Sequence, residues 1–137
     1  MGQEAALPEI RTIVCQVNAV PFPPNPSEPR DPSAHTLLSF PTEIDFSNAG
    51  DMLGRVMSEA RPGDGPWARI VVLDFTATDF MDSQGVRLIN DARRLLRPAT
   101  RVHVVVRPDG VASRVLEVTG LRRDVPVYDN LPEALAA

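Results

Sequence analysis

The stretch from Val71 to Gly85, VVLDFTATDFMDSQG, constrains the fold more than any other part of the chain. It begins within a continuous apolar run, Ile70 to Leu73, which is typical of a strand covered on both faces. From Val86 onward the apolar residues recur at helical spacing. Asp82 or Ser83 can cap this helix by accepting a hydrogen bond from a free backbone N–H. The segment therefore predicts a serine presented where a central strand gives way to a helix, an edge where function tends to lie in open α/β sheets.

Strand and helix patterns alternate along the rest of the chain, which implies parallel β-α-β units with right-handed crossovers. We expect an α/β fold with a mixed sheet, the element order ββαβαβαβα, and an N-terminal β-hairpin formed by the first two strands. The further strands are expected at 11–20, 35–40, 101–107 and 125–128, and the helices at 45–60, from 108 to a cap at Gly120, and from 130 onward. Asp45 or Ser47 is the expected cap of the first helix.

A proline-rich segment, residues 21–32, separates the first two predicted strands. It contains six of the chain's fourteen prolines. Proline lacks a backbone donor and fixes φ, so this segment is predicted to be a long loop within a single domain spanning residues 1–137.

Composition excludes several classes of protein. The chain has 137 residues, enough for one domain with a substantial core, and its net charge of −4 argues against nucleic acid as the main partner. All fourteen basic residues are arginine, which excludes mechanisms that need a lysine. Cys15 is the only cysteine, so no internal disulfide or thiolate metal cluster is expected. No apolar run is long enough to cross a bilayer and no signal peptide is recognisable, so we expect a cytoplasmic protein.

A serine hydrolase is a poor fit to the residues around Ser83. A nucleophile elbow needs small residues on both sides of the serine, and Met81 stands where the first should be. His103 is the only histidine downstream, and it lies in the middle of a valine-rich predicted strand. We interpret it as a structural histidine.

A phospho-receiver domain is also a poor fit. Asp74 ends a predicted parallel strand, as a phosphoacceptor aspartate would. The resemblance to a receiver domain would imply a lysine and a metal-binding acidic cluster at the site, but this chain has no lysine. Asp79 and Asp82 do not make a convincing Mg²⁺ site with Asp74. We therefore expect no metal, no cofactor and no enzymatic activity.

Four sequence stretches resemble the STAS domain, specifically the bacterial anti-sigma-factor antagonists. The most specific is Phe80-Met81-Asp82-Ser83-Gln84-Gly85-Val86, which is similar to the family's D-S-x-G centre and follows Leu73-Asp74-Phe75. The supporting stretches are Thr42-Glu43-Ile44-Asp45, Leu116-Glu117-Val118-Thr119-Gly120-Leu121, and Val127-Tyr128 with Glu133-Ala134-Leu135. Together they cover roughly residues 36–136.

The chain departs from the family pattern at several positions. Thr42 replaces the usual glycine, Gln84 replaces a serine or threonine, and Thr78 stands where an apolar residue is common. Because Gln84 adjoins Ser83, these differences bear on the identity of the partner more than on the fold.

The resemblance implies that Ser83 is phosphorylated by an anti-sigma factor that is also a serine kinase. It further implies that the unphosphorylated protein binds this factor and frees a sigma factor, and that a metal-dependent serine phosphatase restores it. We expect no direct contact with nucleic acid or membrane, and homodimer formation is left open. The expected partner-binding surface surrounds Ser83 and consists of Asp45, Thr78, Asp79, Asp82, Gln84, Gly85 and Arg87.

Two alternative interpretations remain open. One is a scaffold or sensor STAS module that binds protein without using phosphorylation of Ser83. The other is a STAS domain that binds a small ligand such as a nucleotide.

Overall fold

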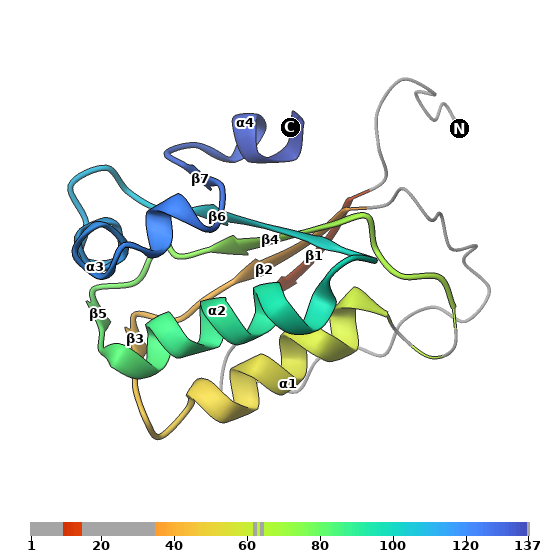
Figure 1. Ribbon diagram of the computed structural model, residues 1–137, viewed down its shortest axis with the longest axis horizontal. Coiled ribbons are helices and arrows are strands. Elements are labelled where there is room, and N and C mark those ends of the chain that lie inside the picture. The colour runs from red at the N-terminus through yellow and green to blue at the C-terminus, as the bar shows by residue number, and fades with distance from the viewer. Residues whose placement is uncertain (1–9, 15–34, 62, 64, 137) are drawn as a thin grey trace.

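The computed structural model describes residues 10–14, 35–61, 63 and 65–136. Five strands form the main sheet, in the spatial order β1-β2-β4-β6-β7 (Figure 1). Their bounds are β1 Ile10–Val14, β2 His35–Ser39, β4 Ile70–Asp74, β6 Arg101–Val105 and β7 Val127–Tyr128. The α/β class and the order of the elements agree with the sequence prediction, apart from two short extra strands.

Every strand pair of the described residues is parallel, which corrects the prediction of a mixed sheet with an N-terminal hairpin. β1 pairs with β2 in parallel, with Ile10 opposite His35 and Val14 opposite Ser39. A parallel pair needs a connection of roughly a dozen residues or more to bring the chain back, and residues 15–34 separate these strands. The predicted loop 21–32, Cys15 and the end of the first predicted strand lie outside the described residues.

The two extra strands form a small separate sheet beside the beginning of helix α2 (Ser83–Leu96). β3 (Glu43–Ile44) pairs in parallel with β5 (Phe80–Met81). β3 follows the main-sheet strand β2 and β5 follows β4, so this sheet continues their carboxyl ends. It places the stretch before Ser83 against the stretch before α1.

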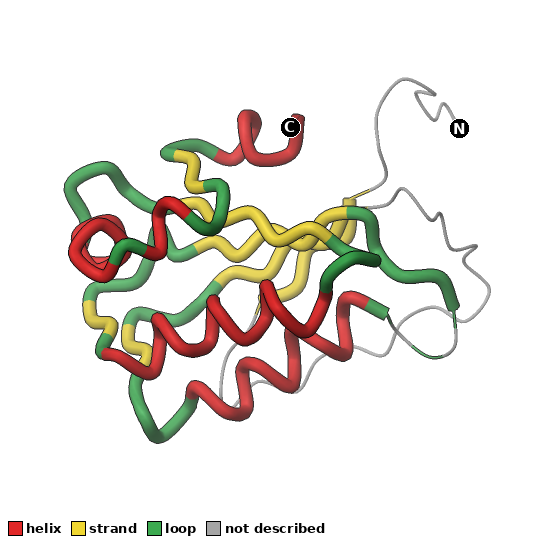
Figure 2. The backbone as a smooth tube through the Cα atoms, in the orientation of Figure 1, coloured by secondary structure: helices red, strands yellow, loops and turns green. Residues whose placement is uncertain are grey.

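Helices cover both faces of the main sheet. α1 (Ala49–Ala60) and α2 (Ser83–Leu96) lie side by side across one face, and α4 (Leu131–Ala136) covers the other (Figures 1 and 2). Val71 and Leu73 belong to the larger core under α1 and α2, whereas Ile70 and Val72 belong to the smaller core under α4. The apolar run of β4 is therefore buried on both faces, as its sequence predicts.

The start of α1 differs from its prediction, whereas the end of α3 (Val111–Thr119) agrees with its prediction. α1 begins at Ala49 rather than Asp45, because the preceding turn is held by other polar contacts, and neither Asp45 nor Ser47 is its cap. α3 ends at Gly120, which has φ 81° and is the predicted left-handed cap. A short 3-10 helix, η1 (Leu121–Arg123), follows it. Among the described residues, no helix has both the length and the apolar character that spanning a bilayer requires.

Candidate functional site

Ser83 is exposed and is the first residue of α2. The preceding Asp82 has extended backbone angles, and its carboxylate accepts the amide proton of Gln84 at 2.8 Å. Asp82 is therefore the N-cap, although the sequence left Asp82 and Ser83 as alternatives. Among the residues that the structure describes, the Ser83 hydroxyl has no hydrogen-bond partner. The hydroxyl therefore takes no part in capping the helix.

Gly85 explains why the first turn of α2 can approach the small sheet so closely. A Cβ atom at this position would lie 2.4 Å from Cγ of Met81 and 3.4 Å from Cγ2 of Ile44. Both neighbours are buried side chains, so neither can move away cheaply. The glycine two residues after Ser83 is therefore required by packing.

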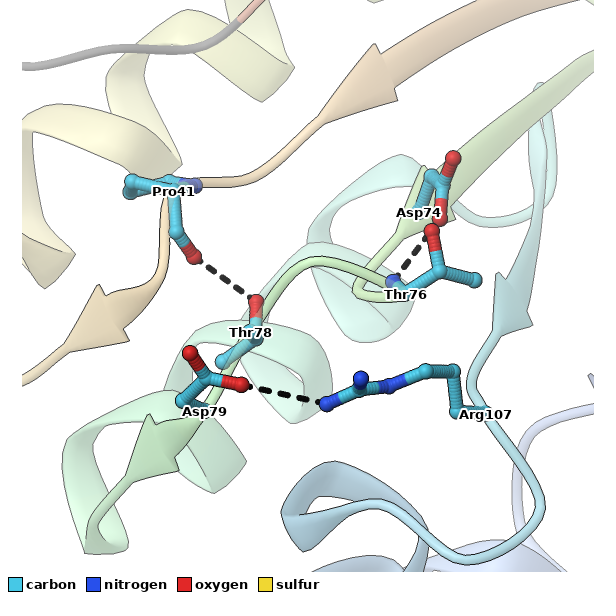
Figure 3. A network of polar contacts seen from close by, with 6 residues as sticks. All are labelled: Pro41, Asp74, Thr76, Thr78, Asp79 and Arg107. Atoms are coloured by element: carbon cyan, nitrogen blue, oxygen red, sulfur yellow. Dashed lines mark hydrogen bonds and ion pairs between the residues drawn. The ribbon is translucent and has the colours of Figure 1, made fainter.

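Several hydrogen bonds hold the loop between β4 and β5, and Figure 3 shows those of Thr78 with Pro41 and of Thr76 with Asp74. The Thr78 hydroxyl donates to the carbonyl of Pro41 at 2.8 Å, and Asp74 accepts the amide proton of Thr76 at 2.9 Å. The amide of Asp79 donates to the carbonyl of Thr42 at 2.7 Å. These bonds join the loop before Ser83 to the segment after β2, so the two segments are positioned as one unit.

An ion pair connects the same loop to the segment that precedes α3. The guanidinium of Arg107 donates to the Asp79 carboxylate at 3.1 Å (Figure 3). Both side chains are more than half exposed, so the pair contributes at most about 1 kcal/mol to stability. The charge of Asp79 is nevertheless partly neutralised before any partner arrives.

Asp45 lies in the turn between β3 and α1. Its carboxylate accepts hydrogen bonds from the hydroxyl of Ser47 at 2.6 Å and from the amide of Ser47 at 2.9 Å. The Ser47 hydroxyl and amide lower the pKa of the Asp45 carboxyl below its ordinary value, because they stabilise the charged form. A carboxylate is thus maintained at this turn.

Arg87 and Ser83 line an open hollow of about 390 Å³ between α2 and the segment after α3. Asn90 of α2 and Leu121 and Asp124 of the opposite wall complete most of it. Arg87 lies 3.9 Å from Asp91, one turn further along the helix. Its charge is available beside Ser83, with only this weak, exposed partner.

Two exposed aromatic residues, which the sequence analysis did not select, lie on the segments that lead to this site. Phe46 follows Asp45 and is 84% exposed, and Phe80 of β5 is 48% exposed. Large exposed apolar side chains often mark protein-binding surfaces. Strand alternation was the available signal for Phe80: it neighbours the buried Met81, so it must point the other way.

The predicted contact residues differ in burial. Thr78 and Gly85 are buried, so their side chains lie beneath the exposed surface around Ser83. Asp79 and Arg87 are exposed, and Asp45, Asp82 and Gln84 are half-buried. In the described part of the chain, no group of three or more histidine, cysteine, aspartate or glutamate side chains is arranged to hold a metal ion.

Comparisons with known proteins show the family to which the chain belongs. The family model of the STAS domain matches residues 26–134, so the chain belongs to the STAS domain family. A crystal structure of an anti-sigma factor antagonist from Mycobacterium paratuberculosis is similar, with a TM-score of 0.66 and 27% sequence identity. That match covers 80% of this chain and 87% of the other. A comparison with curated proteins finds no match.

Proposed function

We propose that this STAS protein is an anti-sigma-factor antagonist whose partner binding is switched off by phosphorylation of Ser83. The unphosphorylated form binds an anti-sigma factor with serine kinase activity in the cytoplasm and frees the sigma factor. A metal-dependent serine phosphatase reverses the modification. The similarity to an anti-sigma factor antagonist supports the general role.

The free hydroxyl of Ser83 is the observation that carries the phosphorylation step. Asp82 provides the helix cap, so the serine is not needed to hold the helix end. Ser83 is exposed at the first position of α2, where a kinase can reach it. The kinase supplies ATP, Mg²⁺ and the catalytic base, so the switch needs no nucleotide site in this chain.

The local hydrogen bonds indicate how a phosphate would act. It adds about −1.5 to −2 charges at pH 7. The amides of Gln84 and Gly85, which could otherwise bind an anion at the helix N-terminus, already donate to Asp82. The phosphate would therefore lie beside the Asp82 carboxylate with few free backbone donors. Water can solvate it in the free protein, but a partner surface would have to desolvate it.

The proposed partner surface combines the aromatic side chains of Phe46 and Phe80 with the polar residues around Ser83. Asp45, Asp79, Asp82, Gln84 and Arg87 provide its charged and polar part. Interfaces of this kind typically bury aromatic anchors inside a polar rim. Phosphorylation would introduce charge within such a surface and release the partner without refolding.

Phosphorylation is tested by incubating the purified full chain with ATP and each candidate anti-sigma kinase, then mapping the modified peptide by mass spectrometry. We expect one phosphate, on Ser83. Ser83→Ala should remain unmodified. Ser58→Ala, a matched change at an exposed serine of α1, should be modified like the wild type. Binding to the kinase without any modification of Ser83 would favour the scaffold interpretation instead.

A further inference from the structure

A second hollow, at the opposite end of α2 from Ser83, is lined by four arginines. Its volume is about 580 Å³, within the range of small-molecule sites. Arg93, Arg94 and Arg97 come from the last turn of α2 and the residue that follows it, and Arg101 begins β6. The rise of an α-helix places this end of α2 roughly 20 Å from Ser83.

Positive charge outweighs negative charge among the described residues that line this hollow, where four arginines lie with one carboxylate. In the part of the chain that the structure describes, ion pairs join Arg87 to Asp91 and Arg107 to Asp79, and none involves the four arginines of the hollow. Asp124 is the one carboxylate in the lining, and it lies in none of these ion pairs. This concentration of positive charge occurs in a chain whose net charge is −4.

Stabilisation of the helix end explains only part of the arrangement. Cationic side chains near a helix C-terminus interact favourably with its dipole, which accounts for Arg93 and Arg94. It does not account for Arg101, which belongs to a strand. It also leaves unexplained the Nε atom of Arg93, which is buried and has no hydrogen-bond partner among the described residues. The Nη2 atom of the same guanidinium donates to Asn90 at 2.8 Å, which holds the group in place.

The chemistry of the lining selects for phosphate groups. Guanidinium groups are planar and bind phosphate oxygens through paired hydrogen bonds. No phenylalanine, tyrosine or tryptophan lines the hollow within the described residues, and the ring of His103 in its lining is fully buried, so a nucleobase would find no exposed aromatic ring to stack on. We propose that this hollow binds a small anion carrying at least two linked phosphate groups. This proposal is independent of the function proposed for Ser83.

Calorimetric titration of the full chain with inorganic pyrophosphate tests the site. We expect a dissociation constant below about 1 mM. Sulfate, which has a single doubly charged group, should bind at least about tenfold more weakly, because it can engage fewer guanidinium groups at once. If pyrophosphate does not bind with a dissociation constant below about 1 mM, or if the two anions bind with equal affinity, the proposal is overturned.

Matched arginine substitutions locate the binding. Arg97→Gln and Arg101→Gln change exposed side chains, so they should fold normally, which circular dichroism can verify. Each should weaken pyrophosphate binding about tenfold, as expected for the loss of one charge-assisted contact. Arg114→Gln makes the same charge change on the exposed surface of α3 and should bind like the wild type. Equal weakening in all three variants would show a general charge effect and reject the site.

A single-stranded oligonucleotide distinguishes a small phosphorylated ligand from a nucleic-acid backbone. We expect it to bind more weakly than pyrophosphate, because the four arginines converge on one hollow and do not form an extended track. Tighter binding of the oligonucleotide, lost in the Arg97 and Arg101 variants, would replace the proposal with a nucleic-acid contact.

Discussion

Arg107 donates a hydrogen bond to Asp79 across 28 residues of sequence and thereby joins the loop before Ser83 to the loop before α3. Asp79 has two separable roles as a result. Its charge is a predicted contact for the anti-sigma factor, and its ion pair positions the loop.

Exchanging the two charges separates these roles. Asp79→Arg and Arg107→Asp should each reduce the free energy of unfolding by no more than about 1 kcal/mol, because the pair is exposed. The double exchange should recover that stability. We expect Asp79→Arg to weaken partner binding and the double exchange not to restore it, since the partner would still meet the wrong charge. Full recovery of binding, measured by titration calorimetry, would show that Asp79 acts only by positioning the loop.

A series of variants at Ser83 tests the switch. Ser83→Ala should bind the anti-sigma factor as tightly as the unmodified protein and should stay bound in the presence of ATP. The phosphoprotein should lose about 2–5 kcal/mol, roughly 30- to 5,000-fold in affinity, because an unpaired charge must be desolvated. Ser83→Asp, with one charge, should be intermediate. Equal affinities for all four proteins would refute the switch.

Phe46 is expected to be an anchor of the partner interface. Because it is 84% exposed, Phe46→Ala should leave the melting temperature nearly unchanged and should cost about 1–4 kcal/mol of binding energy if the side chain enters a pocket of the partner. Leu95→Ala is the matched control, since Leu95 is 58% exposed near the far end of α2. A similar loss of binding in both variants would indicate a non-specific hydrophobic contribution.

Alanine substitution at Gly85 tests the close packing of α2, and the same substitution at Gly54 of α1 is its matched control. Gly85→Ala should destabilise the fold by about 1–3 kcal/mol through overpacking, because its Cβ atom would lie 2.4 Å from Cγ of Met81. Gly54→Ala, in the interior of α1 with no atom within 4 Å of the new Cβ, should stabilise the protein by about 0.5–1 kcal/mol. Chemical denaturation measures both values, and a neutral Gly85→Ala would contradict the close approach.

Stability should fall with acidification because two histidines are buried. Burial lowers the pKa of His103 below its ordinary value of 6.5, and the nearby Arg101 lowers it further, against the raising effect of the bond to Ala134. Burial and Arg69 likewise lower the pKa of His35. The unfolded chain therefore binds more protons than the folded protein as pH falls below about 6.5, and the free energy of unfolding decreases in this window.

His103→Asn tests this pH dependence. The amide can replace the ring N–H that bonds to the Ala134 carbonyl at 2.9 Å, but it does not titrate. We expect the loss of stability between about pH 7 and pH 5 to become smaller, with the remainder due to His35. An unchanged slope in denaturation curves across this range would show that the pKa of His103 does not differ between the folded and unfolded states.

Local patterns in the sequence were sufficient for most of the fold. The apolar run of β4, the helical spacing after Val86 and the glycine after α3 depend on neighbours within a few residues, and the structure confirms all three. The prediction that the first two strands form an antiparallel hairpin was wrong, because β1 and β2 are parallel. The relative direction of two strands depends on where the chain enters the second one, here after the twenty residues 15–34. The composition of the strands carries little information on that direction.

The sequence by itself determined that Ser83 stands at the start of a helix after a central buried strand, because hydrophobic periodicity and capping chemistry act over short distances. Only the tertiary structure decided that Asp82 is the cap and that the serine hydroxyl stays free. β5 pairs with β3, and the amide of Asp82 donates to the carbonyl of Ile44 at 3.3 Å, which places Asp82 at the helix entrance. The burial of Thr78 and the pairing of Asp79 with Arg107 were likewise decided by contacts between segments distant in sequence.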